Sequence, residues 1–135
     1  YAVGGCVRDA CLGLKPHDYD LCTAATPDTT AAVFSDFPLV RAGEKHGTIG
    51  VVLEGEVIEI TTFRTEGDYL DSRHPQWVAF VPTVEQDLAR RDFTVNAMAF
   101  HPKAVSHLYI VQPLFPFRRH LPEPQRYSEF PITFP

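Results

Sequence analysis

Two adjacent glycines near the start of the chain, followed by two carboxylates one residue apart, constrain the fold most. Residues 2–3 are apolar and predict the end of a short buried strand. Because Gly4 and Gly5 have no side chains, the backbone there can approach a ligand closely. A helix that begins at this point directs N–H groups and the positive end of its dipole at the ligand. The pattern therefore favours a bound phosphate group.

The two carboxylates, Asp18 and Asp20, alternate with Tyr19 and Leu21. On a strand over residues 18–22, both carboxylates would face one way and the apolar pair would face the core. Neighbouring carboxylate oxygens suit Mg²⁺, which completes its octahedron with phosphate oxygens and water. A turn and a cap are the alternative interpretation. Two acids around an aromatic residue are costly without a cation, so we favour a magnesium site.

The rest of the chain predicts alternating helices and strands. We expect a helix over residues 6–12 that ends at Gly13, and a second helix that Thr26 caps and that runs to about residue 37. Residues 48–53 and 57–63 predict a hairpin around Gly55. Together with the strands at residues 2–3 and 18–22, these segments predict an α+β fold, a small mixed sheet with helices packed on one side.

The sequence after residue 63 is less regular. Residues 64–82 are polar and aromatic, and we expect a long functional or poorly ordered loop there. Thr83 and Gln86 match a capping box that opens a helix to Arg91. Residues 92–99 predict a helix or turn whose apolar face contains Phe93, Val95, Ala97 and Met98.

Composition limits the class of protein. The 135 residues, 44% of them hydrophobic, suffice for one domain with a core, and no run is long enough to span a membrane. A net charge of −5 argues against a surface built broadly for nucleic acid, so RNA would need a local patch such as Arg8, Lys15, Arg90 and Arg91. The three cysteines have no metal-ligand spacing and are expected to be reduced thiols in a cytoplasmic protein. The chain starts at Tyr1 without a charged and apolar leader, so we expect no secretory signal and a fragment that lacks upstream residues.

Four motifs occur in one order along about three quarters of the chain. They are Gly4-Gly5-Cys6-Val7-Arg8-Asp9, Asp18-Tyr19-Asp20-Leu21, the strand from Ile58 to Arg64, and Arg90-Arg91-Asp92-Phe93-Thr94-Val95-Asn96-Ala97. With these motifs the chain resembles the nucleotidyltransferases of the DNA polymerase beta superfamily. Within that superfamily it is most similar to the bacterial CCA-adding tRNA nucleotidyltransferases and poly(A) polymerases of class II.

The resemblance implies magnesium-dependent transfer of nucleotides from CTP or ATP to the 3′ end of tRNA. It implies that Asp18 and Asp20 hold Mg²⁺ and act in catalysis, with Glu59 as the candidate third carboxylate. Glu59 could equally be an ordinary exposed strand residue, and Arg91 could instead pair with Asp87 one helical turn away. The residues implied in nucleotide binding are Gly4, Gly5, Arg8, Arg91, Asp92 and Asn96.

The resemblance ends near residue 103, so we expect a head domain over residues 1–103 and a divergent, largely irregular tail over 104–135 that is dense in Pro, Phe and Arg. The resemblance implies that relatives continue into a neck domain with a Glu-Asp-x-x-Arg helix that selects the base, and we expect this domain to be missing here. We therefore expect a truncated catalytic head that can associate with itself through apolar surface and has no membrane partner. The alternatives are a poly(A) polymerase head and an inactive remnant that binds nucleotide or RNA.

Overall fold

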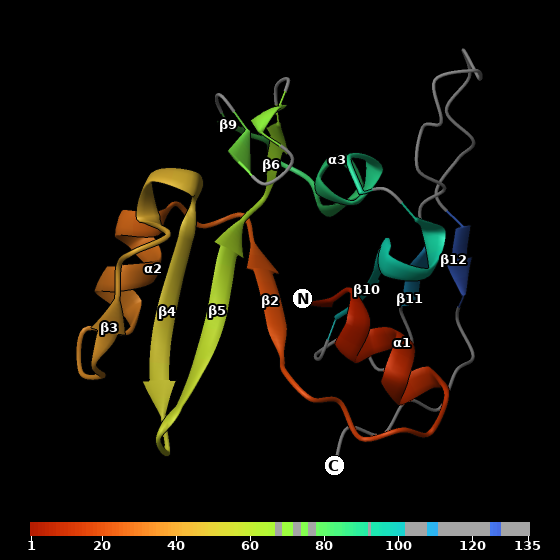
Figure 1. The fold of residues 1–135 in the computed structure, drawn as a ribbon, viewed down its shortest axis with the longest axis horizontal. Coiled ribbons are helices and arrows are strands. Elements are labelled where there is room, and N and C mark those ends of the chain that lie inside the picture. The colour runs from red at the N-terminus through yellow and green to blue at the C-terminus, as the bar shows by residue number, and fades with distance from the viewer. Residues whose placement is uncertain are drawn as a thin grey trace. The chain divides into compact units, whose positions relative to one another are not determined.

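The computed structural model describes residues 1–66, 69–71, 74–75, 78–91, 93–101, 108–110 and 125–127 (Figure 1). The chain divides into two compact units. The first consists of Tyr1–Asp20 together with Leu88–Pro135, and the second of Leu21–Asp87. Within the described ranges, every helix is too short or too polar to cross a lipid bilayer.

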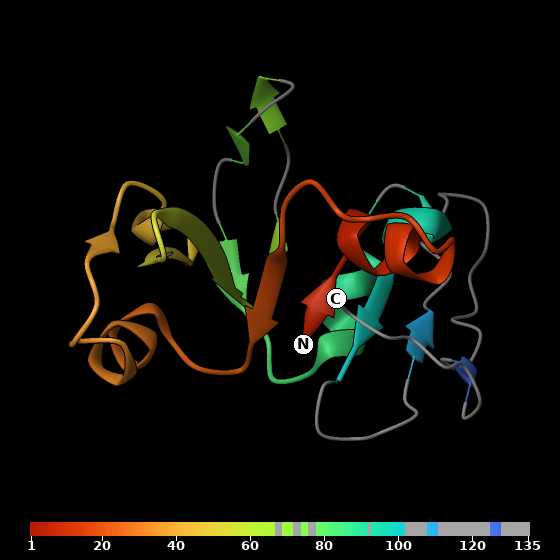
Figure 2. The same cartoon turned by 90° about the horizontal axis from the view of Figure 1, so that it is seen from below.

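The first unit joins strands from the two ends of the chain. Its strands lie in the order β12-β11-β10-β1, and every pair is antiparallel. They are β1 (Ala2–Val3), β10 (Met98–Phe100), β11 (Leu108–Ile110) and β12 (Gln125–Tyr127). In the pairing of β1 with β10, Ala2 lies opposite Phe100 and Val3 lies opposite Ala99. Figure 2 shows β1 in red beside β10 in cyan, with helix α1 next to them.

Helix α1 (Gly5–Cys11) supplies most of the first core. Cys6 and Val7 are buried against Met98 of β10, and Tyr19 packs at the edge of this cluster. The helix ends where predicted, because Gly13 has a φ of 71° and its N–H donates to the carbonyl oxygen of Ala10 at 3.1 Å.

The second unit is built on a hairpin. Its strands lie in the order β2-β5-β4-β3, and β2 and β5 point the same way in Figure 1, so this sheet is mixed. They are β2 (Asp20–Thr23, whose first residue belongs to the first unit), β3 (Leu39–Val40), β4 (Thr48–Leu53) and β5 (Glu56–Thr62). Glu54 and Gly55 both have positive φ, as a two-residue type I′ turn requires. Ile49, Val51 and Ile60 form the second core.

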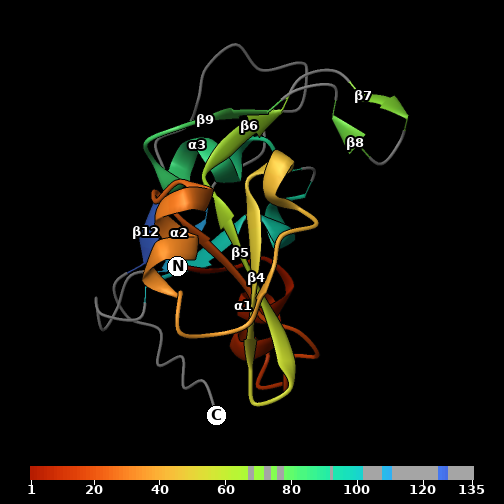
Figure 3. The same ribbon diagram turned by 90° about the vertical axis from the view of Figure 1, so that its left-hand side faces the viewer.

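Helix α2 (Pro27–Val33) packs against β4 and β5 (Figure 3). It begins as predicted, because the Thr26 side chain accepts a hydrogen bond from the N–H of Thr29 at 3.3 Å and Pro27 occupies the first turn. It ends four residues before the predicted limit of residue 37. A 3-10 turn, Glu44–His46, precedes β4.

The segment expected as an irregular loop contains four short strands. Strand β6 (Arg64–Glu66) pairs with β9 (Val78–Phe80), and β7 (Tyr69–Asp71) pairs with β8 (His74–Pro75) (Figure 3). The two ends of the segment therefore form a two-stranded ribbon. The polar composition of the segment gave no sign of these strands. The N–H of Arg64 donates to the buried carboxylate of Asp87 at 3.1 Å, which anchors the base of this ribbon.

Helix α3 (Val84–Ala89) begins after Thr83, whose hydroxyl accepts from the N–H of Gln86 at 3.4 Å. The prediction for residues 92–99 is wrong in its second half. A 3-10 turn at Thr94–Asn96 leads directly into strand β10. Phe93 and Val95, predicted to face the core, are 56% and 49% exposed. Pairing with β1, at the far end of the sequence, overrides the local pattern.

Together the two units give an α+β fold, as predicted. The predicted boundary at residue 103 stays a prediction. Most of the expected tail lies outside the described residues, and β11 and β12 are the parts of it that the structure describes.

Candidate nucleotide site

The glycine pair lies at the start of helix α1, where two arginine side chains approach the backbone. Gly4 has a φ of 75° and makes no side-chain cap, and its N–H donates to the carbonyl oxygen of Met98 at 2.9 Å. A Cβ atom on Gly4 would lie 3.2 Å from Nη1 of Arg91 and 3.8 Å from the backbone oxygen of Asn96. The backbone conformation therefore favours glycine here, and a side chain would fit only if Arg91 shifted.

Gly5 lies near the other arginine. A Cβ atom on Gly5 would lie 3.5 Å from Nη2 of Arg8, which is an ordinary contact distance. The guanidinium groups of Arg8 and Arg91 thus lie against consecutive glycines. The structure brings together the predicted nucleotide-binding residues Gly4, Gly5, Arg8, Arg91 and Asn96.

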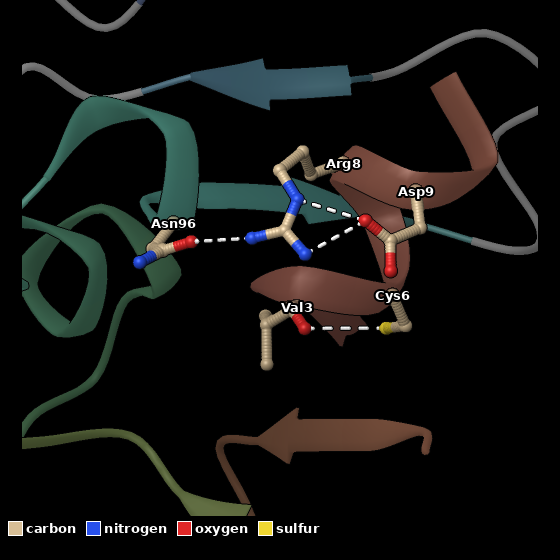
Figure 4. Close-up of polar contacts among 5 residues, drawn as sticks. All are labelled: Val3, Cys6, Arg8, Asp9 and Asn96. Carbon is tan, nitrogen blue, oxygen red and sulfur yellow. Dashed lines mark hydrogen bonds and ion pairs between the residues drawn. The ribbon is translucent and has the colours of Figure 1, made fainter. Parts of the chain in front are cut away.

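Arg8 is held by two side chains (Figure 4). Its Nε donates to Oδ1 of Asp9 at 2.8 Å, and its Nη2 lies 2.7 Å from the same oxygen. Its Nη1 donates to Oδ1 of Asn96 at 3.1 Å. The sequence interpretation included Arg8 and Asn96 but missed Asp9, although Asp9 lies within the same motif.

The acid pair differs from its prediction. Strand β2 begins at Asp20, and Asp18 lies in a bend two residues earlier, so the carboxylates do not share a strand face. Tyr19 and Leu21 pack against the first and the second core respectively, as the alternation indicated. The strand begins at Asp20, the residue at which the chain passes from the first unit to the second.

The charges around Asp20 show how the acid pair is arranged. Desolvation raises the pKa of Asp20 above its ordinary value, and repulsion from the Asp18 carboxylate raises it further. The positive charge of Arg91 lowers this pKa and so opposes the rise. Both acids are exposed, but the charges of Asp18 and Arg91 still act on the Asp20 carboxyl group. The acid pair and the arginine at the glycine turn are therefore electrostatically connected.

The buried thiol of Cys6 connects helix α1 to the backbone on either side of this site. Its Sγ lies 3.2 Å from the carbonyl oxygen of Val3 (Figure 4) and 3.9 Å from that of Asp20. Burial raises the pKa of the Cys6 thiol, which keeps it protonated as a donor. Cys6, Cys11 and Cys22 are free thiols.

Two further predicted site residues are Glu59 and Asp92. Glu59 lies in the second unit, on β5 opposite Gly50, exposed between the partly buried Ile58 and the buried Ile60. Its orientation away from the core agrees with the alternation on which the prediction rested, and its catalytic role stays a prediction. Asp92 lies outside the described residues.

Comparison with known proteins identifies the family. Residues 1–111 match the poly A polymerase head domain. The chain belongs to this family.

Relatives of this head domain are CCA-adding enzymes. The chain is 52% identical to the CCA-adding enzyme of Geobacillus thermodenitrificans over 99 residues, which are 73% of this chain and 24% of that protein. The chain thus spans about a quarter of the length of this relative.

Two solved structures share the fold and differ in what they bind. The crystal structure of the Bacillus stearothermophilus CCA-adding enzyme in complex with CTP is 44% identical, with a TM-score of 0.62, over 75% of this chain and 23% of that one. The CCA-adding enzyme of Thermotoga maritima complexed with tRNA(CCA) is 31% identical, with a TM-score of 0.53, over 76% of this chain and 22% of that one. Both support the α+β head fold described above.

Proposed function

We propose that this chain is the catalytic head of a magnesium-dependent nucleotidyltransferase that adds CMP and AMP, from CTP and ATP, to the 3′ end of tRNA. The observation that carries the proposal is the gathering of two arginine side chains at the glycine turn, with Arg91 in electrostatic reach of the acid pair. The relatives named above support it, since they are CCA-adding enzymes and one was solved with CTP and another with tRNA.

The donor set fits Mg²⁺. Asp18 and Asp20 offer hard carboxylate oxygens whose mutual repulsion a cation would relieve. Among the described residues no group of three or more His, Cys, Asp or Glu is arranged as a metal site. Asp18 and Asp20 would therefore supply the protein ligands, and phosphate oxygens and water the others. When bound, Mg²⁺ would offset the charge of the triphosphate and ease attack by the 3′-hydroxyl group.

The remaining residues would bind and orient the nucleotide. Arg8 and Arg91 would neutralise negative charge on the triphosphate, a role that suits the planar and permanently charged guanidinium group. The glycine pair would let the phosphates approach the backbone. The RNA 3′-hydroxyl group would lose its proton to water, its oxygen would attack the α-phosphorus, and pyrophosphate would leave. The arginines and the acid pair would stabilise the charge at the two ends of this displacement. We place the protein in the cytoplasm, which the free cysteines favour.

The test is incorporation of labelled CTP and ATP into tRNA that lacks its CCA end, with and without Mg²⁺. Asp18→Asn and Asp20→Asn keep the size of each side chain and remove its charge. We expect each to lower incorporation by roughly a hundredfold or more, because metal binding is lost. The matched control is Asp36→Asn, an exposed acid in the second unit, which should leave incorporation unchanged. Incorporation that survives in both site variants would contradict the proposal.

A poly(A) polymerase head is the second candidate, because the matched family is described as the poly A polymerase head domain. The two activities differ in the RNA acceptor and in the number of nucleotides added. Addition that stops after CCA on the trimmed tRNA supports the first candidate. Extended addition of AMP alone to an unrelated RNA 3′ end supports the second.

A nucleotide-binding remnant without turnover is the third outcome. The chain spans about a quarter of its relatives' length, so the residues that select the base and hold the tRNA can lie elsewhere. Binding of CTP without incorporation would indicate this case. Self-association through exposed apolar side chains such as Phe93 and Val57 stays a prediction, which sedimentation at several concentrations checks.

A further inference from the structure

The interaction between Arg8 and Asp9 is unusual for neighbours in a helix. Side chains at consecutive helical positions do not normally face each other. Here the guanidinium group of Arg8 turns back, so that Nε and Nη2 meet the same carboxylate oxygen of Asp9 at 2.8 Å and 2.7 Å (Figure 4). On the other side of the guanidinium group, Nη1 donates a hydrogen bond to Oδ1 of Asn96 at 3.1 Å, and Asn96 lies 88 residues later in the chain.

Stability alone gives little reason for this arrangement. The Arg8 side chain is 36% exposed and that of Asp9 is 22% exposed, and ion pairs with this much access to water contribute roughly 0–1 kcal/mol. The pair Arg41–Glu44 in the second unit, at 2.9 Å, is an ordinary surface pair in which one terminal nitrogen meets one oxygen. Arg8 instead has all three of its nitrogens engaged by the described residues, which fixes both the plane and the rotation of its guanidinium group.

The contacts also determine which N–H groups of Arg8 remain to bind a ligand. A guanidinium group carries five N–H donors. Asp9 and Asn96 take three of them, which leaves one N–H on Nη1 and one on Nη2. Nη2 lies beside Gly5, where a side chain would come within 3.5 Å of it. Arginine binds phosphate oxygens through such terminal N–H groups.

We propose that Asp9 is a positioning residue. It holds the guanidinium group of Arg8, with Asn96 on the opposite side, so that the N–H groups left on Nη1 and Nη2 meet the phosphates of a bound nucleoside triphosphate. This inference rests on the proposed function, because it takes CTP or ATP as the ligand of Arg8. A long flexible side chain that is already ordered loses less entropy when the ligand binds, and this raises affinity.

The experiment is a double-mutant cycle on nucleotide affinity. The dissociation constants of CTP and ATP are measured by titration calorimetry with Mg²⁺ for the full chain and for Arg8→Ala, Asp9→Ala and the double variant. We expect Asp9→Ala to weaken binding roughly tenfold when Arg8 is present, a change typical of losing a charge-assisted hydrogen bond. When Arg8 is already alanine, the same change should alter affinity by less than about twofold.

Two further variants act as controls. Asp9→Asn keeps the size of the side chain and one acceptor oxygen, so its loss of affinity should be smaller than that of Asp9→Ala. If Asp9→Ala does not fold, as judged by the loss of a cooperative unfolding transition, Asp9→Asn takes its place in the cycle. Glu44→Ala removes the surface ion pair with Arg41 in the second unit and should leave nucleotide affinity unchanged. With trimmed tRNA, Asp9→Ala should raise KM for CTP more than it lowers kcat.

The outcomes separate this inference from the proposed function. Asp9→Ala that weakens binding equally with and without Arg8 would overturn the inference, because Asp9 would then act on the fold and not through Arg8. Unchanged affinity in both Asp9 variants would overturn it too. If the unsubstituted chain binds neither CTP nor ATP, the proposed function fails and the inference fails with it.

Discussion

Two helices of seven residues, α1 in the first unit and α2 in the second, begin in opposite ways. Helix α2 has a capping hydroxyl from Thr26, a proline in its first turn and the acidic Asp28 beside its dipole. Helix α1 begins at a glycine with positive φ, without a side-chain cap and without an acid in its first turn. The side chain of Thr26 accepts a hydrogen bond from an N–H group at the start of α2. No side chain caps the start of α1, and the guanidinium groups of Arg8 and Arg91 lie near its two glycines. The difference separates a helix start that its own cap stabilises from one that we propose as part of a nucleotide site.

The variant Gly4→Ala, at the start of α1, should have the largest effect on activity. Alanine at a φ of 75° is strained by about 1–2 kcal/mol, and its Cβ would lie 3.2 Å from Nη1 of Arg91. We expect incorporation to fall roughly a hundredfold because the arginine is displaced. Gly55→Ala in the second unit, at a φ of 88° with nothing within 4 Å, should lose similar stability but no activity per folded molecule. Equal losses of activity in the two variants would contradict the comparison.

Truncation of Val7 tests how far α1 depends on its packing. Val7 is fully buried in the first core, and Val7→Ala should lower the free energy of unfolding by about 2 kcal/mol. Chemical denaturation measures this loss. Val57→Ala is the control, because Val57 on β5 is 51% exposed, and it should change stability by less than about 0.5 kcal/mol.

Removal of the α2 cap should affect stability without affecting the site. Thr26→Ala leaves the N–H of Thr29 without its side-chain acceptor and should cost about 1 kcal/mol. Thr26→Ser keeps the hydroxyl group and should recover most of the loss. Nucleotide affinity should stay the same in both variants, and a drop in affinity for Thr26→Ala would show that α2 also supports the site.

Removal of the negative charge of Asp20 should change the stability least among these variants. Because the pKa of Asp20 is raised in the fold, the folded protein disfavours its charged form, and this cost is present at neutral pH. As the pH falls through the raised pKa, the folded state takes up the proton first and the cost disappears. Asp20→Asn should therefore stabilise the protein by less than about 1 kcal/mol at neutral pH, and this gain should fade in acid.

Thermal unfolding without Mg²⁺, at about pH 7 and about pH 4, measures the difference. Asp36→Asn is the control, since this acid is exposed in the second unit. A stabilisation by Asp20→Asn that grows as the pH falls would have the wrong sign for a raised pKa.

The same contrast explains what the sequence could predict. The hairpin of β4 and β5 and the cap of α2 depend on residues that are neighbours in the chain, such as Gly55 and Thr26, and both were predicted correctly. The glycine turn and its arginines were predicted as a group through the family motifs. Strand β10 was missed because its partner β1 lies at the other end of the sequence.

The local geometry of the acid pair was missed for a related reason. Alternation of polar and apolar residues indicated one continuous strand, and Tyr19 and Leu21 are indeed on the apolar side. They pack in different cores, however, and the strand begins only at Asp20. Asp9 was missed because an acid next to an arginine in a helix carries no periodic signal, and its contact with Arg8 depends on how a side chain turns.

The pairing of β1 with β10 has a consequence for synthesis. Residue 2 finds its partner only when residue 100 has been made, whereas the second unit, Leu21–Asp87, is already complete by then. Domains fold as units during translation, and contacts between distant residues form late because closing a long loop is slow. On the ribosome, therefore, the hairpin unit can form first, and the glycine turn acquires Arg91 and Asn96 last. In a nascent chain, the second unit would therefore fold before the glycine turn, the proposed nucleotide site, is complete.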